Sequence, residues 1–551
     1  MAIEDHIARV MGVKETKSQS DPEWIPPPWF DLKSVRDPQT RAKWMEPDLK
    51  EIEGIHNNEC VREVLLDDLT PEEQKDIIDC LTPRVVKRSG KMKSRVVSRG
   101  DQMKQGIHYQ RSHSPTLMHV SMRFLFSLAA IMGLKIIGGD FSQAFLNADL
   151  DENEWYYMWP PKSARQYDEQ GRRIVWLVVK SLYGGKNAGR NWYKTLREFL
   201  LSEGFEQCYC EPCVFFRRDG DKILIIGAYV DDLIMLYSHD DEMAEWVSKV
   251  QDKFDFTLQD PLKDMCGIEV NITEDHVTLT LTKYTEQLAE EFLTEEERAE
   301  VVHVPCTEEL PKEVTKALQQ DPALVPKTLL REYQRLTGCI QFACTTVRAD
   351  IAYAVGQLAR AQSRPTPELL TCAKRVLQYL YNTKEIGINY SRKSPLNIQG
   401  FSDADWGVRC SVSGYAFLMA DSVVSYLSKL QSVITVASAH SEIYSLSLAA
   451  LESVFLLGMG EQVLGKVLAP VDIAVDSKAA ADLAQDFMSN SRVRHFERRQ
   501  LKVRELVARS LVAVSRVGTL DNVADIFTKP LGRRLFEKHR KKLFNLGSAS
   551  R

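Results

Sequence analysis

Two adjacent aspartates, Asp231 and Asp232, interrupt the apolar run IIGAYVDDLIML at 225–236. Such a run predicts a buried strand, but a strand sends successive side chains to opposite faces, so one flat strand cannot bury both acids. We therefore expect a tight hairpin with the acids at its tip. Neighbouring carboxylates repel unless a cation lies between them, and a pair of divalent ions about 3.5–4 Å apart relieves this repulsion. The pair thus predicts an Mg²⁺ site; the alternative is an ordinary surface turn.

The segments around this pair predict a sheet packed on helices. Residues 122–133 are rich in helix formers, and the apolar start of KIIGGDFSQAFL predicts a strand that ends at Asp140. Residues 214–236 predict a strand pair with RRDGD as the turn. The hairpin tip would then lie beside Asp140. Between Arg84 and Arg99 we expect a basic hairpin with SGK at 89–91 as its turn and RVVSR as its return strand.

The rest of the chain divides into three stretches. The first 45 residues, with DPEWIPPPW at 21–29, predict an extended arm because proline fixes φ and favours extended neighbours. After Thr282 the pattern is mostly helical and is broken by the proline-bearing stretch 306–327. From about 396 it predicts three short strands, a long amphipathic helix over 438–465, a strand at 471–477 and another helix. Neither a Walker loop nor GxGxxG occurs, which argues against mononucleotide-fold ATP chemistry.

Length and composition predict a globular chain of several domains. The 551 residues, 44% apolar and 27% charged, suggest three or four domains, at about 100–200 residues each. No apolar stretch approaches the ~18 residues that cross a bilayer, the best being 124–134, and the N-terminus does not resemble a signal peptide. Eleven cysteines form no disulfide framework, and Cys208, Cys210 and Cys213 lack the second half of a zinc module. We expect reduced cysteines and no membrane partner.

Charge is unevenly distributed along the chain. The net charge of −5 argues weakly against a nucleic-acid partner. However, residues 84–111 carry nine Lys or Arg against one acid, and residues 491–551 carry sixteen against five. Patches of this size suit a phosphate backbone, the alternative being a merely solvated surface.

Many ordered motifs, from about residue 40 to about 545, resemble the reverse transcriptase and RNase H portion of copia-class LTR retrotransposon Pol polyproteins. The polymerase-like motifs are KSRVVSRG (93–100), DFSQAFLNADL (140–150), SLYGGKNAGRNWY (181–193), YVDD (229–232), MCGIEV (265–270) and RADIAYAVGQLAR (348–360). The RNase H-like motifs are GFSDADWG (400–407), SGYAFL (413–418), SEIYSL (441–446), AVDSKAA (474–480) and ADIFTKPL (524–531). No aspartic protease triplet, HHCC module or integrase core is visible.

The resemblance implies roles for the matching residues. In the polymerase, Asp140 and Asp231 would bind two Mg²⁺ ions, with Asp232 as a third, more peripheral carboxylate, and Mn²⁺ could substitute. The residues implied in substrate binding are Arg95 with Lys87 or Arg88 at the triphosphate, Phe145 as the steric gate, Asn187 and Tyr229 at the nucleotide pocket, and Cys266 and Gly267 in the primer-grip turn. For Phe145, core packing is an equal alternative.

A second set of acids matches RNase H. They are Asp403, Glu442, Asp476 and Asp525, and two Mg²⁺ ions there would activate water against the RNA strand of a hybrid. Asp403 and Asp476 each close an expected strand, Glu442 lies near the start of the long helix, and Asp525 lies at a short final helix. One cluster can therefore gather carboxylates from distant parts of the chain.

Two motifs depart from the family pattern. In one of them, SKLQSVITVASAHSEIY at 428–444, Glu442 is kept but a neighbouring acid of the family pattern is missing. SLYGGKNAGRNWY stands where the family has SLYGLKQAPRAWY, so Asn187 replaces a glutamine, and Gly185 and Gly189 add freedom to the loop. This change favours weaker nucleotide selection, whereas the seven intact carboxylates favour catalysis.

The sequence therefore predicts a multidomain α+β and α/β chain, a right-hand polymerase followed by an RNase H-like domain. We expect an extended arm (1–45), fingers and palm (46–270), a helical thumb or connection (271–395) and the RNase H-like domain (396–545). The implied partners are an RNA template, a DNA primer, an RNA–DNA hybrid, dNTPs and other retrotransposon products, in cytoplasmic particles or the nucleus. The alternatives are a non-catalytic nucleic-acid-binding relic and a chain with RNase H activity only.

Overall fold

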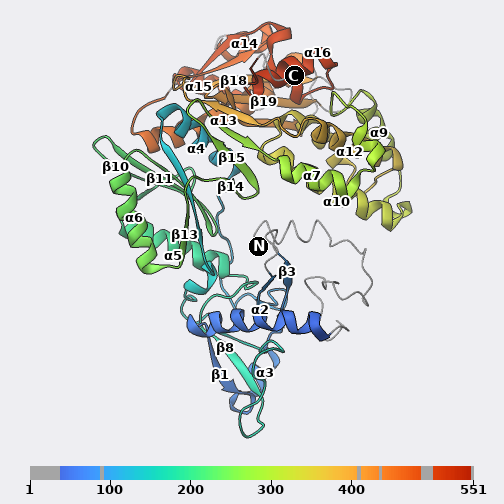
Figure 1. Cartoon of the computed structure of the whole chain (residues 1–551). Coiled ribbons are helices and arrows are strands. Elements are labelled where there is room, and N and C mark those ends of the chain that lie inside the picture. The colour runs from blue at the N-terminus through green and yellow to red at the C-terminus, as the bar shows by residue number, and fades with distance from the viewer. Residues whose placement is uncertain are drawn as a thin grey trace.

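Helix α2 (Pro38–Asn57) begins the described part of the chain. The computed structural model describes residues 38–86, 92–405, 411–432, 437–468, 470–485 and 501–547. Figure 1 shows an N-terminal lobe at the bottom of the view, a sheet with helices above it, and the remaining helices and the C-terminal sheet at the top. The expected arm extended to residue 45, but residues 38–45 are helical. Trp44 is fully buried, so packing of this helix outweighs the extended bias of the segment.

The N-terminal lobe contains three small sheets. One sheet has the strand order β1 (Val61–Leu65), β8 (Ile174–Val178), β7 (Tyr156–Met158). The other two are strand pairs: β2 (Cys80–Leu81) with β5 (Val97–Ser98), and β3 (Arg84–Val86) with β4 (Met92–Ser94). The lobe also contains the short helices η2 (Leu66–Asp68) and α3 (Pro71–Lys75). The basic hairpin is therefore β3–β4, and its return strand lies at 92–94. The expected return strand at 95–99 is wrong because residues 97–98 pair with β2 instead. Its turn, 87–91, lies outside the described residues.

A six-stranded antiparallel sheet forms the centre of the molecule. Its strand order is β13 (Phe256–Gln259), β6 (Lys135–Phe141), β12 (Asp232–Tyr237), β11 (Lys222–Tyr229), β10 (Val214–Asp219) and β9 (Glu206–Gln207). The apolar runs found in the sequence are β6, β11 and β12. The hairpin β11–β12 and the turn between β10 and β11 confirm the expected strand pairs, and β6 ends one residue beyond Asp140.

Helices cover both faces of this sheet. Ile136 packs in the cluster that includes α4 (His119–Met132), whereas Ile137 packs in the cluster that includes α5 (Ala188–Ser202) and α6 (Asp240–Lys253). This two-residue alternation explains why the strands are almost wholly apolar. Helix α4 ends at Gly133, whose φ of 66° is easily adopted only without a Cβ.

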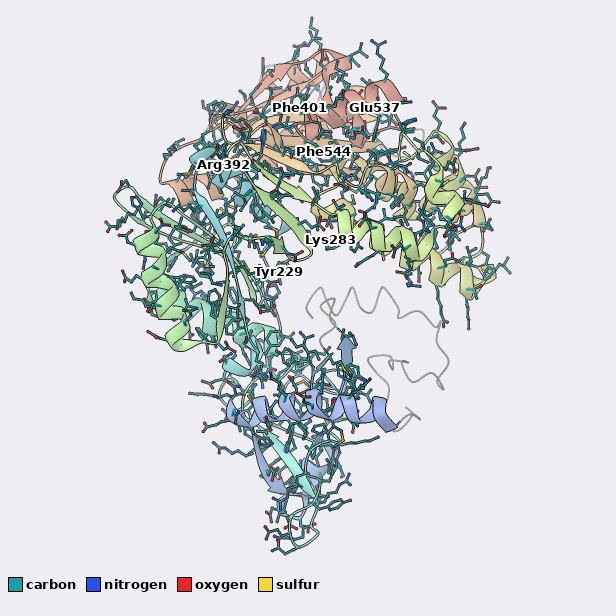
Figure 2. The ribbon with its side chains drawn as sticks, viewed as in Figure 1. Tyr229, Lys283, Arg392, Phe401, Glu537 and Phe544 are labelled. Atoms are coloured by element: carbon teal, nitrogen blue, oxygen red, sulfur yellow. The ribbon has the colours of Figure 1, made fainter. Side chains whose placement is uncertain are left out.

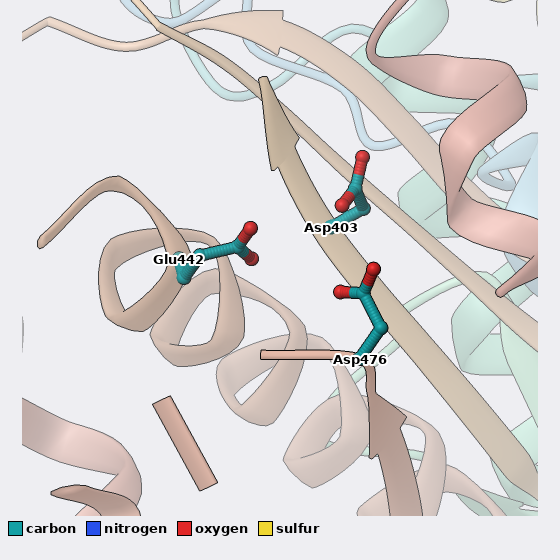
Figure 3. A group of neighbouring side chains, drawn as sticks. All are labelled: Asp403, Glu442 and Asp476. Carbon is teal, nitrogen blue, oxygen red and sulfur yellow. The ribbon is translucent and has the colours of Figure 1, made fainter. Parts of the chain in front are cut away.

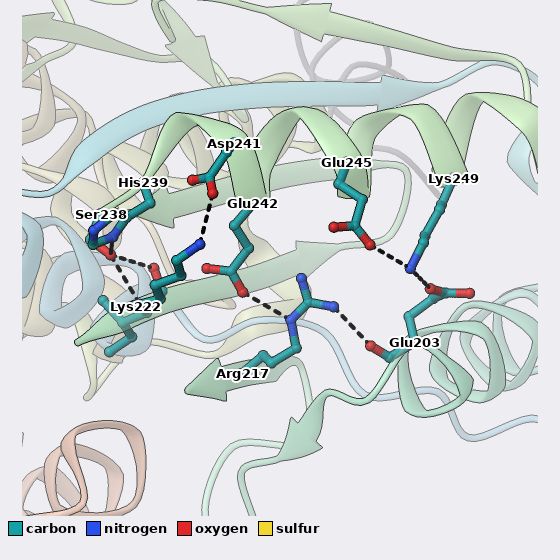
Figure 4. Close-up of polar contacts among 10 residues, drawn as sticks. Glu203, Arg217, Lys222, Ser238, His239, Asp241, Glu242, Glu245 and Lys249 are labelled. Atoms are coloured by element: carbon teal, nitrogen blue, oxygen red, sulfur yellow. Dashed lines mark hydrogen bonds and ion pairs between the residues drawn. The ribbon is translucent and has the colours of Figure 1, made fainter. Parts of the chain in front are cut away.

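Ion pairs join α6 to strands β10 and β11 (Figure 4). Arg217 Nε on β10 lies 3.0 Å from Glu242 Oε1, and Lys222 Nζ on β11 lies 2.7 Å from Asp241 Oδ2. The Arg217–Glu242 pair is largely buried, whereas Asp241 is mostly exposed. We therefore expect the first pair to contribute more to the position of α6.

A four-stranded sheet and a set of helices follow. The sheet order is β14 (Asp264–Met265), β15 (Ile268–Ile272), β16 (His276–Thr280) and β17 (Ile388–Ser391). The helices are α7 (Thr282–Phe292), α8 (Glu295–Ala299), α9 (Glu309–Ala317), η4 (Pro322–Leu324), α10 (Lys327–Thr346), η5 (Ala349–Ile351), α11 (Ala352–Arg360) and α12 (Pro367–Asn382). The segment 271–395 is thus mostly helical, as expected, but β16 and β17 pair within it and α9 occupies part of the expected break at 306–327.

The C-terminal part is a five-stranded mixed sheet with helices. The sheet order is β20 (Ser422–Leu430), β19 (Val412–Met419), β18 (Gln399–Asp405), β21 (Val471–Val475) and β22 (Val512–Arg516). Strands β18, β21 and β22 pair in parallel, whereas β18–β19 and β19–β20 are antiparallel. The helices are α13 (Ser438–Leu464), α14 (Lys478–Gln485), α15 (Lys502–Ala508), η7 (Thr519–Asp521), η8 (Val523–Phe527) and α16 (Arg533–Leu543).

Helix α13 is long and apolar enough to cross a membrane by length and composition. This corrects the expectation that the longest apolar run lies at 124–134. However, 67% of the apolar window is buried in the protein, and α13 packs on β18 and β19. Its apolar character is therefore typical of a core helix, and the expected amphipathic pattern is wrong.

Candidate functional site

The backbone brings Asp140, Asp231 and Asp232 to one edge of the central sheet. Tyr229 pairs with Asp232 across the β11–β12 hairpin, so Val230 and Asp231 form its two-residue turn. Asp232 in turn pairs with Asp140 on β6. The structure thus confirms the tight hairpin and its place beside the end of β6. The three aspartates are therefore backbone neighbours at the ends of two strands, which is the arrangement expected from the sequence.

Two hydrogen bonds hold the turn in place. The buried indole of Trp192, on α5, donates from Nε1 to the carbonyl oxygen of Val230 over 2.6 Å. The amide of Phe141 donates to the carbonyl oxygen of Asp231 over 3.0 Å. Val230 has a φ of 57°, which is costly for a β-branched residue. The surrounding structure therefore fixes a turn that its own sequence does not favour.

A second turn lies against this one. Cys266 and Gly267 join β14 to β15, with φ values of 54° and 81°, as a type I′ hairpin turn requires. Cys266 Sγ lies 3.9 Å from Asp232 Oδ2. Burial raises the pKa of the Cys266 thiol well above its ordinary value, and the carboxylates of Asp232 and Asp231 raise it further. The thiol therefore stays neutral beside the acids.

Two aromatic rings, of Phe145 and Tyr183, lie near the aspartates. Phe145, half-buried in η3 (Ala144–Asn147), packs edge-on against Tyr183 with ring centroids 5.3 Å apart. The Arg95 guanidinium lies over the same Tyr183 ring, 5.2 Å from its centroid. Burial raises the pKa of Tyr183, and Asp231 and Asp140 act in the same direction. Arg95 and Phe145 are thus brought near the acids, whereas Lys87 and Arg88 lie outside the described residues.

Tyr229 and Asn187 differ in their surroundings. Tyr229 is half-buried in the middle of the molecule (Figure 2), and burial, followed by Cys266 and the two aspartates of the hairpin, raises its pKa to about 12. Asn187 is fully buried at the start of α5 and donates from Nδ2 to Glu154 Oε2 over 2.7 Å. The expected pocket-lining amide is therefore already bound by a carboxylate of its own chain.

The second set of acids forms a compact group (Figure 3). Asp403 on β18, Glu442 in the first turns of α13 and Asp476 directly after β21 each offer an oxygen, and these oxygens all lie within 4.8 Å of one another. The parallel pairing of β18 with β21 places the two aspartates side by side. As expected, the acids come from distant parts of the chain, although β18 continues two residues past Asp403.

Asp525 approaches the group from η8 but is held by a lysine. Lys529 Nζ lies 3.0 Å from Asp525 Oδ1 and 3.7 Å from Asp403 Oδ2. Thr528 Oγ1 also donates to Asp403 Oδ2. Gly414, the cross-strand partner of Asp403, makes room for this approach, because a Cβ there would lie 2.7 Å from Thr528 Cγ2 and 2.8 Å from Phe527 Cβ.

Two carboxyls of this group hold their protons unusually strongly. Burial, and then the carboxylates of Asp403 and Asp476, raises the pKa of Glu442 to about 9. Burial, and then Asp403, raises the pKa of Asp525 to about 7. Among the residues that the structure describes, Glu442 Oε2 is buried and has no hydrogen-bond partner. Hard carboxylate oxygens that repel one another suit Mg²⁺ or Mn²⁺, so the residues fit the expected cation.

Comparison with known proteins shows which family and which relatives this chain resembles. Residues 79–306 match the family described as reverse transcriptase (RNA-dependent DNA polymerase). Pol polyproteins from the transposons TNT 1-94 of Nicotiana tabacum and RE1 of Arabidopsis thaliana are 28% and 27% identical over 81% and 82% of this chain. Over most of its length the chain is similar to copia-type retrotransposon Pol polyproteins.

Other relatives extend this comparison. The transposon Ty1-BL Gag-Pol polyprotein of Saccharomyces cerevisiae is 26% identical over 82% of the chain. The chain spans only 26–33% of the length of these curated relatives. A solved foamy viral protease-reverse transcriptase in complex with dsDNA matches 86% of this chain and 83% of its own, with 11% identity and a TM-score of 0.44. A likeness of that size carries no argument about this chain.

Some residues that shape the two sites were missed by sequence reasoning. Trp192 and Tyr183 lie in the motif SLYGGKNAGRNWY, and Thr528 and Lys529 lie in ADIFTKPL, so all four stood in quoted motifs. Nothing in their spacing indicates that Trp192 binds a turn 38 residues away or that Lys529 meets Asp403.

Proposed function

We propose that the chain is an RNA-directed DNA polymerase with an attached RNase H, both dependent on Mg²⁺ and able to use Mn²⁺. The single observation that carries the polymerase half is the pairing of Asp140 with Asp232 beside the Asp231 turn, inside the matched reverse transcriptase segment. Residues 46–270 would form fingers and palm, 271–395 the thumb or connection, and 396–545 the RNase H-like domain.

The polymerase residues divide the work of nucleotidyl transfer. Asp140, Asp231 and Asp232 would hold the ions, which activate a primer 3′-hydroxyl and hold the leaving pyrophosphate. Arg95, lying over Tyr183, would contact the triphosphate, since a guanidinium offers bidentate hydrogen bonds to phosphate oxygens. The ring of Phe145, held against Tyr183, would exclude a 2′-hydroxyl from the sugar position.

The RNase H half rests on the compact group of Asp403, Glu442 and Asp476 with Asp525 beside it. These acids would hold the ions that activate water against the RNA strand of an RNA–DNA hybrid. A mixed sheet with a long helix across it supports the RNase H-like assignment. The basic segments 84–111 and 491–551 would contact the nucleic-acid backbone without reading its sequence.

A chain with RNase H activity only is the second candidate. The hydrogen bond from Asn187 to Glu154 favours it, because the amide at this position is not free to contact a nucleotide. A non-catalytic nucleic-acid-binding relic would instead lack both activities.

The deciding experiment measures both activities of the purified chain. We expect Mg²⁺-dependent extension of a DNA primer on an RNA template and cleavage of the RNA strand of a hybrid. The double variant Asp231→Asn, Asp232→Asn should lose extension and keep cleavage, whereas Glu442→Gln should do the reverse. Asp252→Asn and Asp482→Asn, exposed acids on α6 and α14, are matched controls that should change neither. Cleavage without extension would leave the nuclease candidate, and hybrid binding without either activity would leave the relic.

A further inference from the structure

We infer that Lys529 is a built-in cation of the C-terminal carboxylate group, which a second metal ion must displace. The inference rests on the proposed RNase H function. It starts from an asymmetry among the four acids. Asp403, Glu442 and Asp476 each offer an oxygen that lies within 4.8 Å of the other two. Asp525 is instead bound by the Lys529 ammonium at 3.0 Å.

The ammonium lies where a cation shared by Asp403 and Asp525 would lie. Its Nζ contacts Oδ1 of Asp525 and is 3.7 Å from Oδ2 of Asp403, so it bridges the two carboxylates. Both aspartates are almost fully buried, and buried carboxylates need a partner of opposite charge. Lys529 supplies that charge in the metal-free chain.

The lysine is placed so that it can leave. It lies four residues after Asp525 and two residues beyond the end of η8, and its side chain is 34% exposed although the acids are buried. A lysine is a point charge on a flexible four-carbon stem, so the ammonium can turn toward solvent without movement of the backbone. Thr528 keeps its hydrogen bond to Asp403 in either position, because it is held by the short helix itself.

Unequal metal affinities follow from this arrangement. The first ion would enter the group of Asp403, Glu442 and Asp476. There Lys529 Nζ lies 3.7 Å from Asp403 and, among the described residues, no lysine forms an ion pair with Glu442 or Asp476. The second ion, between Asp403 and Asp525, would have to replace a positive charge and would bind more weakly. Lys529 would therefore lower second-ion affinity while it stabilises the metal-free fold.

Direct binding of Mn²⁺ to the full chain tests this inference. The measurement is made by titration calorimetry and electron paramagnetic resonance, in a background of Asp231→Asn, Asp232→Asn so that the polymerase acids do not contribute. We expect Lys529→Met to bind the second ion at least about tenfold more tightly and to unfold at lower temperature in chelator. Lys529→Arg should retain the weak second site. Lys538→Met, which removes an exposed lysine paired with Asp521, should behave like the unchanged chain.

The outcomes separate the inference from the proposed function. Unchanged second-ion affinity in Lys529→Met would overturn the inference, provided the unchanged chain binds ions and cleaves hybrid. Absence of any ion binding at the acids in the unchanged chain would instead overturn the RNase H function. If Lys529→Met does not fold by circular dichroism, Lys529→Gln, which keeps a hydrogen-bond donor without the charge, decides in the same way.

Discussion

The indole nitrogen of Trp192 lies 2.6 Å from the carbonyl oxygen of Val230, the residue before the aspartate pair. This one hydrogen bond joins helix α5 to the turn that carries Asp231. Because Val230 has a positive φ, the turn depends on contacts from outside its own hairpin. The position of the adjacent acids Asp231 and Asp232 is therefore set in part by a tryptophan 39–40 residues before them.

We expect Trp192→Phe to lower primer extension by about tenfold and the free energy of unfolding by about 1–3 kcal/mol, because a buried carbonyl loses its donor. RNase H activity should remain. The matched control is Trp246→Phe on the same side of the sheet, since Trp246 Nε1 is buried without a hydrogen-bond partner. Equal loss of extension in both variants would show that packing, and not the hydrogen bond, positions the turn.

Gly414 provides a second prediction. A methyl group at this position would push Thr528 and Phe527 away from β19, so Gly414→Ala should displace η8 and with it Asp525. We expect hybrid cleavage to fall at least about tenfold while primer extension is kept. Gly532→Ala, where a Cβ meets no atom within 4 Å, is the control. Normal cleavage by Gly414→Ala would show that hybrid cleavage does not depend on the close approach of η8 to β19.

The acids of the C-terminal group predict a pH dependence of stability without metal. The pKa of Glu442 in the folded chain is raised from its ordinary 4.5 to about 9, so between these values the unfolded chain has released a proton that the folded chain still holds. Stability must therefore fall as pH rises through this window. Thermal unfolding in chelator should show this fall, and Glu442→Gln should reduce it. Saturating Mg²⁺ should also reduce it, because metal binding favours the deprotonated acid. A variant with the same slope as the unchanged chain would contradict the assignment.

Arg123 contacts two other elements besides its own helix, so its substitution tests how these three parts of the chain are held together. From α4 it donates to the carbonyl oxygens of Val424 on β20 and of Thr345 and Thr346 on α10, each over 2.7 Å, and it lies over the Tyr426 ring. Lysine cannot reproduce this planar set of donors.

We therefore expect Arg123→Lys to lower the free energy of unfolding by about 2–4 kcal/mol, measured by denaturant titration, with both activities affected together. Arg331→Lys, an exposed position on α10, should change it by less than about 0.5 kcal/mol. A small effect of Arg123→Lys would show that packing alone joins these elements.

The sequence by itself determined local features whose causes are local. The apolar run 225–236 with two acids indicated a hairpin, although tertiary contacts hold its turn, and Gly133 and Gly465 mark the ends of α4 and α13, where both have positive φ. The sequence likewise predicted the long helix from 438 and the strand before Asp476. These features follow from backbone geometry and from the alternation of side chains, which neighbouring residues set.

Only the tertiary structure decided which distant residues meet. It paired Asn187 with Glu154, placed Lys529 between two acids and made Gly414 the site where η8 approaches. It also extended α2 into the expected arm, because burial of Trp44 outweighs local preference. The physical reason is common to all of them: contacts between residues far apart in the chain depend on how whole elements pack, and no local pattern of residue types encodes that packing.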